Sequence, residues 1–260
     1  MKRFLYLSLS ILLFLSACST LLAPQPATST PAPTNTLEPT FTSSPTETPT
    51  LVPTSTPNKT ATAVAQATET SNTVLTELDV LLGDTDIPYK QGHLAWKQVK
   101  QMSVDLSGPS WDYVEIDKDL TASNFILKSD ITWEASGIII CGVTFRSEPN
   151  LEQGRQYQFV YLRLSGLPAW DIELFDFGRF KNSPTKTQFS DAIDQANGAT
   201  NQVVLIAQDE QFNLYINHAR QGRYFDYSKQ RMDGAFAFNG SQDSGKGSCK
   251  FENSWIWVLE

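Results

Sequence analysis

The sequence contains few of the residues that hold transition metals. Among 260 residues there are two histidines and three cysteines. A zinc site needs several Cys or His ligands at short spacings, whereas His93 and His218 stand alone in the chain. The acidic segments also lack the spacing of a calcium-binding loop. We therefore expect no metal and no other cofactor.

Basic residues are also scarce relative to acidic ones. The chain has 20 Lys and Arg against 28 Asp and Glu, a formal charge of −8. Nucleic-acid binding requires a basic patch that displaces counterions, so nucleic acid is excluded as a partner. The same deficit argues against electrostatic binding to anionic lipid headgroups. Attachment to a membrane would have to come from another feature.

No apolar run is long enough to span a membrane. The longest apolar stretch covers residues 4–14 and follows Lys2 and Arg3. A transmembrane helix needs about 20 residues. A basic start followed by a short apolar stretch and small residues is typical of a cleaved export signal, which we place at residues 1–17.

The predicted cleavage site carries a more specific motif. Leu15-Ser16-Ala17-Cys18 resembles the bacterial lipobox. The resemblance implies that the Cys18 thiol is lipidated and that cleavage makes Cys18 the mature N-terminus, with a charge of about −10 after loss of two basic residues. Several acyl chains give stable anchoring. We expect an extracytoplasmic lipoprotein, anchored in a bacterial membrane and displayed at the cell surface; an ordinary secretory signal is the alternative.

The next segment has a composition that cannot form a core. Residues 20–72 contain nine prolines and sixteen threonines and no glycine. Such chains stay unfolded and extended, at roughly 3 Å per residue. We predict a lipid-anchored, disordered linker over residues 18–72, and a folded domain over 73–260. Helical spacing of apolar residues between Val74 and Leu82 predicts a short helix at the start of this domain, ended by Gly83.

The domain itself has an all-β pattern. Apolar and polar residues alternate from Phe125 to Trp133, which predicts a strand with one buried and one solvated face. Turn-forming residues separate such runs about every ten residues, which is typical of a sandwich with about ten to twelve strands. The other predicted strands cover 138–146, 156–164, 170–177, 203–207, 212–217, 235–238 and 249–259.

Four of these segments together resemble a known family. They are Gly142-Val143-Thr144-Phe145-Arg146, residues 157–164, residues 212–217 and residues 251–257. Over about residues 90–260 the chain is similar to concanavalin A-like jelly rolls, particularly 3-keto-disaccharide hydrolase-like and laminin-G-like domains. The resemblance implies an all-β jelly-roll sandwich. That fold hosts lectins, glycosidases and adhesion modules, so it does not by itself define an activity.

Two residue positions follow from the resemblance. His218 stands where the family commonly has glycine; because Asn and His tolerate positive φ, we expect Asn217-His218 to form a hairpin turn. Domains of this type can pair a cysteine before the strand at 142–146 with one in the last strand. We therefore expect a Cys141–Cys249 disulfide in the oxidising compartment, with two buried free thiols as the alternative.

A catalytic interpretation rests on one acidic segment. Residues 115–119, Glu-Ile-Asp-Lys-Asp, resemble the Glu-x-Asp-x-Glu strand of laminarinase-type glucanases. Retaining glycosidases hold two carboxyl groups about 5 Å apart, whereas residues four apart on a strand are farther separated, and the side chain of Asp119 is short. We expect a solvated strand face here and assign no catalytic residue.

Binding of a ligand is the preferred hypothesis. Sugars stack on aromatic rings and bond to planar polar groups, and the predicted contacts are Arg146, Tyr161, Arg163 and Trp170. We expect a non-catalytic recognition domain for a glycan or an envelope protein. A glycoside hydrolase and a structural or sensory lipoprotein without a small ligand remain as alternatives.

Overall fold

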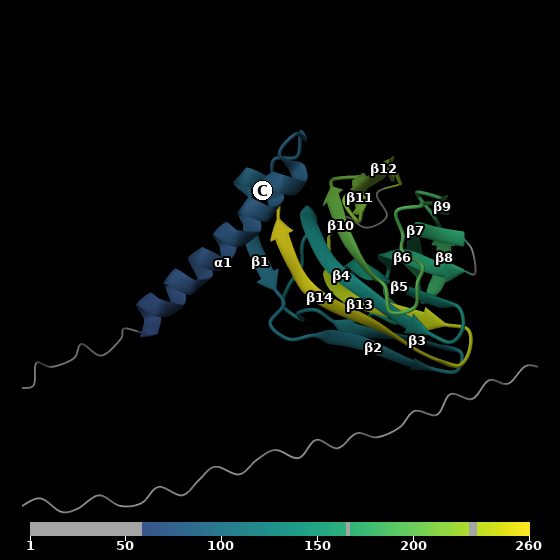
Figure 1. Ribbon diagram of the computed structural model, residues 1–260. Helices are drawn as coiled ribbons and strands as arrows, with labels where there is room; N and C mark the ends of the chain where they lie inside the picture. Colours follow the sequence, from purple (N-terminus) through teal and green to yellow (C-terminus); the bar gives the residue numbers. More distant parts are fainter. Residues whose placement is uncertain (1–58, 165–166, 229–232) are drawn as a thin grey trace, which may run out of the picture. The chain divides into compact units, whose positions relative to one another are not determined.

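The computed structural model describes residues 59–164, 167–228 and 233–260. The predicted export signal, Cys18 and the linker up to residue 58 therefore lie outside the described residues. Within those ranges the chain forms a β-sandwich and one long helix (Figure 1). None of the helices in these ranges is long and apolar enough to cross a membrane.

The strands form two antiparallel sheets of seven strands each. Sheet A contains, in order of pairing, β1 (His93–Lys97), β14 (Lys246–Val258), β4 (Phe125–Ala135), β10 (Thr200–Gln208), β11 (Gln211–Ile216) and β12 (Ala219–Phe225), and β2 (Met102–Ser107) also pairs with β14. Sheet B contains β3 (Ser110–Glu115), β13 (Ala235–Gln242), β5 (Ile139–Ser147), β6 (Gln156–Leu164), β7 (Leu167–Asp176) and β8 (Arg179–Asn182), and β9 (Gln188–Phe189) also pairs with β7.

The chain passes repeatedly from one sheet to the other. Strands β2, β4 and β14 belong to sheet A, and strands β3, β5 and β13 belong to sheet B. The last strand, β14, lies between β4 on one side and β1 and β2 on the other. The first and the last strands of the domain are therefore neighbours in sheet A. The predicted fold class, an all-β concanavalin A-like jelly-roll sandwich, is confirmed.

Alternation along the strands builds the core between the sheets. In β4, Phe125, Leu127 and Trp133 point inward and are fully buried. The disulfide between Cys141 of β5 and Cys249 of β14 joins the two sheets, with 5.7 Å between the Cα atoms. The predicted pairing is therefore confirmed, and it closes a loop with a sequence separation of 108.

Helix α1 (Lys59–Leu82) is longer than the sequence pattern predicted. It begins inside the segment that was expected to be disordered up to residue 72, because alanine replaces proline there and nothing breaks the backbone hydrogen bonds. Val74, Leu78 and Leu82 lie on one side of the helix and are buried. The predicted end is confirmed, since the Gly83 N–H donates to the Asp79 carbonyl at 3.0 Å.

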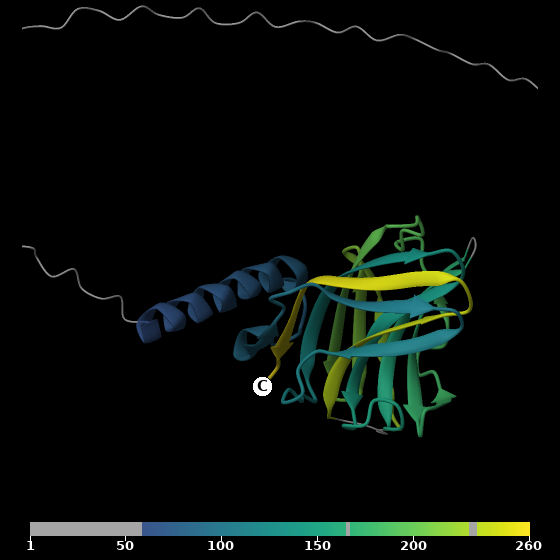
Figure 2. The ribbon, with the colours of Figure 1, turned by 90° about the horizontal axis from the view of Figure 1, so that it is seen from below.

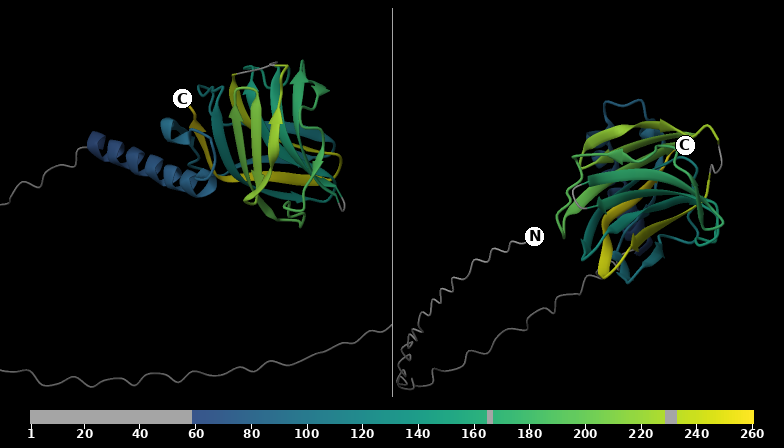
Figure 3. Two further views of the ribbon diagram at one scale, coloured as in Figure 1. Left: turned by 90° about the horizontal axis from the view of Figure 1, so that it is seen from above. Right: turned by 90° about the vertical axis from the view of Figure 1, so that its right-hand side faces the viewer.

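This apolar side of α1 forms a second core on the outer face of sheet A. It packs on buried residues of three strands: Ile126, Val204, Ile206, Trp255 and Trp257. The prediction that one face of β4 is wet is therefore wrong at this end, where α1 covers the sheet. The helix residues 62–69 are exposed, and this half of α1 reaches away from the strands in Figure 2 and in the left view of Figure 3.

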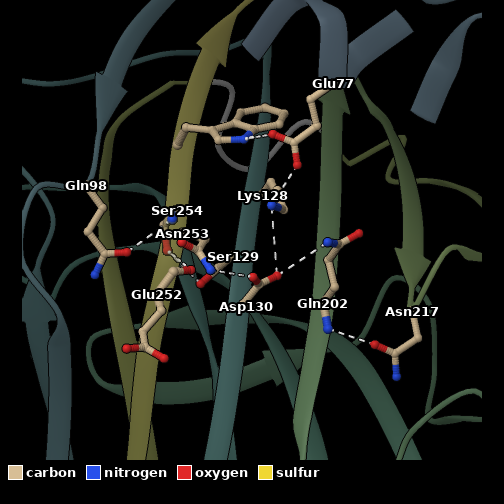
Figure 4. Close-up of polar contacts among 11 residues, drawn as sticks. Glu77, Gln98, Lys128, Ser129, Asp130, Gln202, Asn217, Glu252, Asn253 and Ser254 are labelled. Atoms are coloured by element: carbon tan, nitrogen blue, oxygen red, sulfur yellow. Dashed lines mark hydrogen bonds and ion pairs between the residues drawn. The ribbon is translucent and has the colours of Figure 1, made fainter. Parts of the chain in front are cut away.

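A charged contact fixes the helix on the sheet (Figure 4). Glu77 of α1 lies 2.7 Å from the ammonium group of Lys128, which also lies 4.0 Å from Asp130. The second oxygen of Glu77 accepts a hydrogen bond of 3.0 Å from the Trp255 indole. Helix and sheet therefore bury Lys128 together with two carboxylates that pair with it.

The β11–β12 connection is the two-residue turn that the sequence predicted. Asn217 and His218 have φ values of 48° and 66°. Both residues lie in the left-handed region that a type I′ hairpin turn requires. The expectation that His218 belongs to a turn is confirmed.

Candidate functional site

The outer face of sheet B carries a cavity of about 380 Å³. This volume lies within the range of small-molecule sites, roughly 300–1,000 Å³. Five strands of sheet B supply its wall, together with the turn after β7: Ser110, Trp111, Ile140, Gln158, Val160, Glu173, Phe175, Gly178, Asn239 and Ser241. No helix covers this face among the described residues.

Strand register brings the polar residues of the cavity together. Asn239 lies between Tyr113 of β3 and Gly142 of β5, and Gln158 of β6 lies opposite Glu173 of β7. Their chain neighbours Phe238, Phe159 and Ile172 point into the core. Because side chains alternate between the faces of a sheet, these polar groups all point outward.

Aromatic rings form one side of the cavity. Trp111 is 39 % exposed although it is a large apolar side chain. Its ring lies 4.6 Å from that of Tyr113 and is stacked 5.9 Å from that of Phe175. Neighbouring rings thus hold Trp111 in place while part of its surface remains accessible.

Two amide side chains are held in the sheet beside these rings. The Asn239 amide donates to the Thr144 hydroxyl at 2.9 Å, and the Tyr113 hydroxyl accepts from Gln156 at 3.1 Å and from Gln158 at 3.5 Å. Burial raises the pKa of Tyr113 to about 12, so its hydroxyl remains a neutral donor. Asn239 and Gln158 are both buried, which fixes the positions of their polar atoms.

A glycine makes room for one of these amides. A Cβ atom at Gly142 would lie 2.9 Å from Oδ1 of Asn239. Real Cβ atoms do not approach an oxygen so closely. The glycine in β5 therefore leaves room for the Phe159 carbonyl oxygen, 2.0 Å from that Cβ position, and for the Asn239 amide.

The acidic residue in the wall is Glu173. Burial, and then the neighbouring Asp171, raise the pKa of its carboxyl group to about 7. Among the described residues no hydrogen bond or ion pair engages this carboxyl group. By contrast, the Asp171 carboxylate accepts hydrogen bonds from the hydroxyls of Ser183, Thr185 and Thr187. Glu173 is thus the group in the cavity that is free to bind a ligand.

Two of the predicted contact residues lie inside the sandwich. Trp170 and Tyr161 point into the core between the sheets and are 1 % and 0 % exposed, so their predicted surface position is wrong. Both residues lie in strands, as predicted, but their side chains are on the face of sheet B that packs against sheet A. For Arg163 the side chain lies outside the described residues; its backbone pairs with Ile139 and Pro168.

Arg146 is also wrong as a surface contact. Its φ of 50° turns the side chain of this strand residue into the end of the sandwich. There its guanidinium group donates to the Ser123 carbonyl and lies 5.5 Å from the Phe212 ring. Burial lowers the pKa of Arg146 to about 10. Its role is to bind the backbone and ring packed around it.

The acidic segment at 115–119 does not form one strand face. Strand β3 ends at Glu115, and the Asp119 N–H donates to the Asp117 carboxylate at 3.0 Å in the turn that follows. All three carboxylates are exposed. They are solvated as expected. Only Glu115 lies in a strand, however, so the three carboxylates do not alternate along one strand as predicted. Within the described ranges no group of three or more His, Cys, Asp or Glu side chains is arranged to hold a metal.

The sequence offered a weak signal for the residues that it missed. Trp111 and Tyr113 alternate with polar residues, as do Glu173 and Phe175 with apolar ones. Either alternation is compatible with both faces of a sheet. Only the pairing of β3 with β13, and of β6 with β7, places these residues around one cavity.

Sequence comparison finds no matching protein family and no matching curated protein. Solved structures with a similar arrangement include a carbohydrate-binding module from Bacillus subtilis, with 16 % identity, 58 % of this chain and 83 % of that chain covered, and a TM-score of 0.46. Another is a β-glucanase from Bacillus licheniformis, with 9 % identity, coverage of 63 % and 82 %, and a TM-score of 0.44. Likeness at this level establishes no activity for this chain.

Proposed function

We propose that this chain is a recognition protein that binds a saccharide in the cavity of sheet B. The half-exposed Trp111 beside the buried amides of Gln158 and Asn239 is the observation that carries the proposal. A sugar ring presents an apolar face that packs on an aromatic ring and hydroxyls that bond to fixed polar groups. The cavity offers both kinds of surface side by side.

The location of the protein is part of the proposal. A lipid on Cys18 and an extended linker would hold the domain outside the membrane, where it meets glycans of the envelope or of other cells. The disulfide between Cys141 and Cys249 supports an oxidising compartment. The protein would then act by attachment, with the linker supplying its reach.

Hydrolysis is the second candidate, and one observation favours it. Glu173 has a carboxyl group with a pKa of about 7, which suits a general acid. Glycosidases of the two-carboxylate type need a second carboxyl group facing the substrate. The next carboxylate on β7, Asp171, does not line the cavity and is bound by three hydroxyls. Binding without cleavage is therefore the preferred function.

The test is a titration of the purified protein with a panel of oligosaccharides, followed by tryptophan fluorescence and calorimetry. We expect Trp111→Ala to weaken binding at least about tenfold, because stacking area is lost. Tyr227→Ala is the matched control, since Tyr227 is 75 % exposed but does not line the cavity.

Three results would decide between the candidates. Loss of binding in Trp111→Ala alone supports saccharide recognition at this cavity. Release of new reducing ends by the wild type, abolished in Glu173→Gln, would support hydrolysis instead. If no saccharide binds, or if Trp111→Ala binds as well as the wild type, the proposed site is wrong.

A further inference from the structure

The cavity wall carries charge of one sign. Of the described residues that line it, Glu173 has an ionisable side chain and none is Lys, Arg or His. Two neighbouring carboxylates act on residues of this site: Asp171 acts on Glu173, and Glu152 acts on Tyr113. The potential inside the cavity therefore favours a cation over an anion.

Two basic groups beside β7 are paired with another carboxylate. Arg155 and Lys181 lie 3.2 Å and 3.7 Å from the carboxylate of Asp176, and neither lines the cavity. They are thus directed to another carboxylate of β7. Among the described residues, no ion pair joins a basic group to Glu173.

The Glu173 carboxylate is costly to keep charged without a partner. It is partly buried, and Asp171 on the same face of β7 repels its charge, which together raise its pKa to about 7. An ammonium group placed against it would compensate both effects. The attraction between the ammonium group and the carboxylate is stronger here than at the surface, because the sheet and the rings exclude part of the water.

The remaining walls also suit an amine. The faces of aromatic rings attract cations, and Trp111 and Phe175 supply such rings. Asn239, which lines the cavity, uses its amide nitrogen on Thr144, so its amide oxygen is the remaining acceptor of that side chain. An ammonium group donates three hydrogen bonds and accepts none, so acceptors of this kind match it.

We infer that the cavity binds a saccharide unit with a free amino group, and that the ammonium group lies on Glu173. This inference rests on the proposed saccharide binding at the same cavity and names the class of sugar. Sugars that carry carboxylate, sulfate or phosphate groups are disfavoured by the same charges. Neutral sugars bind through stacking and through hydrogen bonds to the amides, but without the ion pair, and therefore more weakly.

Two oligosaccharides of equal length make the test direct. One is built of glucosamine and the other of N-acetylglucosamine, so that they differ in charge while the rings are the same. We expect the wild type at pH 7 to bind the glucosamine oligosaccharide at least about tenfold more tightly.

Glu173→Gln should remove this preference, while binding of the N-acetylated oligosaccharide is retained. Glu115→Gln is the matched control, because Glu115 is an exposed carboxylate of the same sheet that does not line the cavity. It should behave as the wild type.

The outcomes separate this inference from the proposed function. If both oligosaccharides bind equally and Trp111→Ala weakens both, saccharide binding stands and the amino-sugar preference is refuted. If Glu173→Gln keeps the preference, the ammonium lies elsewhere and the inference is again refuted. If neither these oligosaccharides nor any in the panel bind, the proposed function falls together with it.

Discussion

Replacing Glu77 by glutamine would test how helix α1 is held on the sandwich. The Glu77 carboxylate contacts Lys128 at 2.7 Å and accepts a hydrogen bond from Trp255 at 3.0 Å. Glutamine keeps an oxygen for Trp255 but removes the charge that faces Lys128. The Lys128 side chain is 8 % exposed, so its ammonium group would lie largely buried without this counter-charge.

The expected loss follows from the burial of the two partners. Breaking a buried ion pair from one side costs about 3–5 kcal/mol. Because the Glu77 side chain is 33 % exposed and Asp130 remains 4.0 Å from Lys128, we expect a smaller loss, about 2–3 kcal/mol of unfolding free energy. For a domain of this size that lowers the Tm by about 4–12 °C.

Urea denaturation followed by tryptophan fluorescence, together with scanning calorimetry, measures this change. The double variant Glu77→Leu/Lys128→Met removes both charges and should return to within about 1 kcal/mol of the wild type. Glu69→Gln, on the exposed half of the helix, is the control and should change stability by less than about 0.5 kcal/mol. If Glu77→Gln is as stable as the wild type, the ion pair does not hold the helix.

Two further predictions concern the cysteines. Reduction of the Cys141–Cys249 disulfide, which spans 108 residues, should lower the free energy of unfolding by about 4–5 kcal/mol in the chain-entropy model; unchanged stability, or two alkylatable thiols in the unreduced protein, would contradict it. Cys18→Ser should abolish incorporation of radiolabelled palmitate and release the protein from the membrane fraction; retention of an unlabelled wild-type protein in the membrane would contradict lipidation.

Alternation in the sequence was sufficient to predict the long strands. The predicted run at 156–164 coincides with β6, and the run that begins at Phe125 lies within β4. In these strands one face is buried in the core, which excludes polar residues from alternate positions. Short strands at the sheet edges were missed, such as β8 (Arg179–Asn182), in which every residue is exposed. A strand without a buried face leaves no alternation to detect.

The contact residues could not be predicted from residue type. Trp170 was expected at the surface and Trp111 was overlooked, although both stand in strands of sheet B. In each strand a shift of one position exchanges the core for the solvent. The opposing sheet decides which side becomes the core, and that information is spread over the whole domain.

By itself, the sequence determined the local features: the alternating strands, the helical spacing from Val74 to Leu82 with its end at Gly83, and the turn at Asn217-His218. Each depends on neighbours within a few residues, where backbone geometry and burial act directly. The tertiary structure alone decided the cavity, because Trp111, Glu173 and Asn239 belong to strands far apart in the chain. Their proximity arises from hydrogen-bonded register across five strands of sheet B, and no local pattern specifies that pairing.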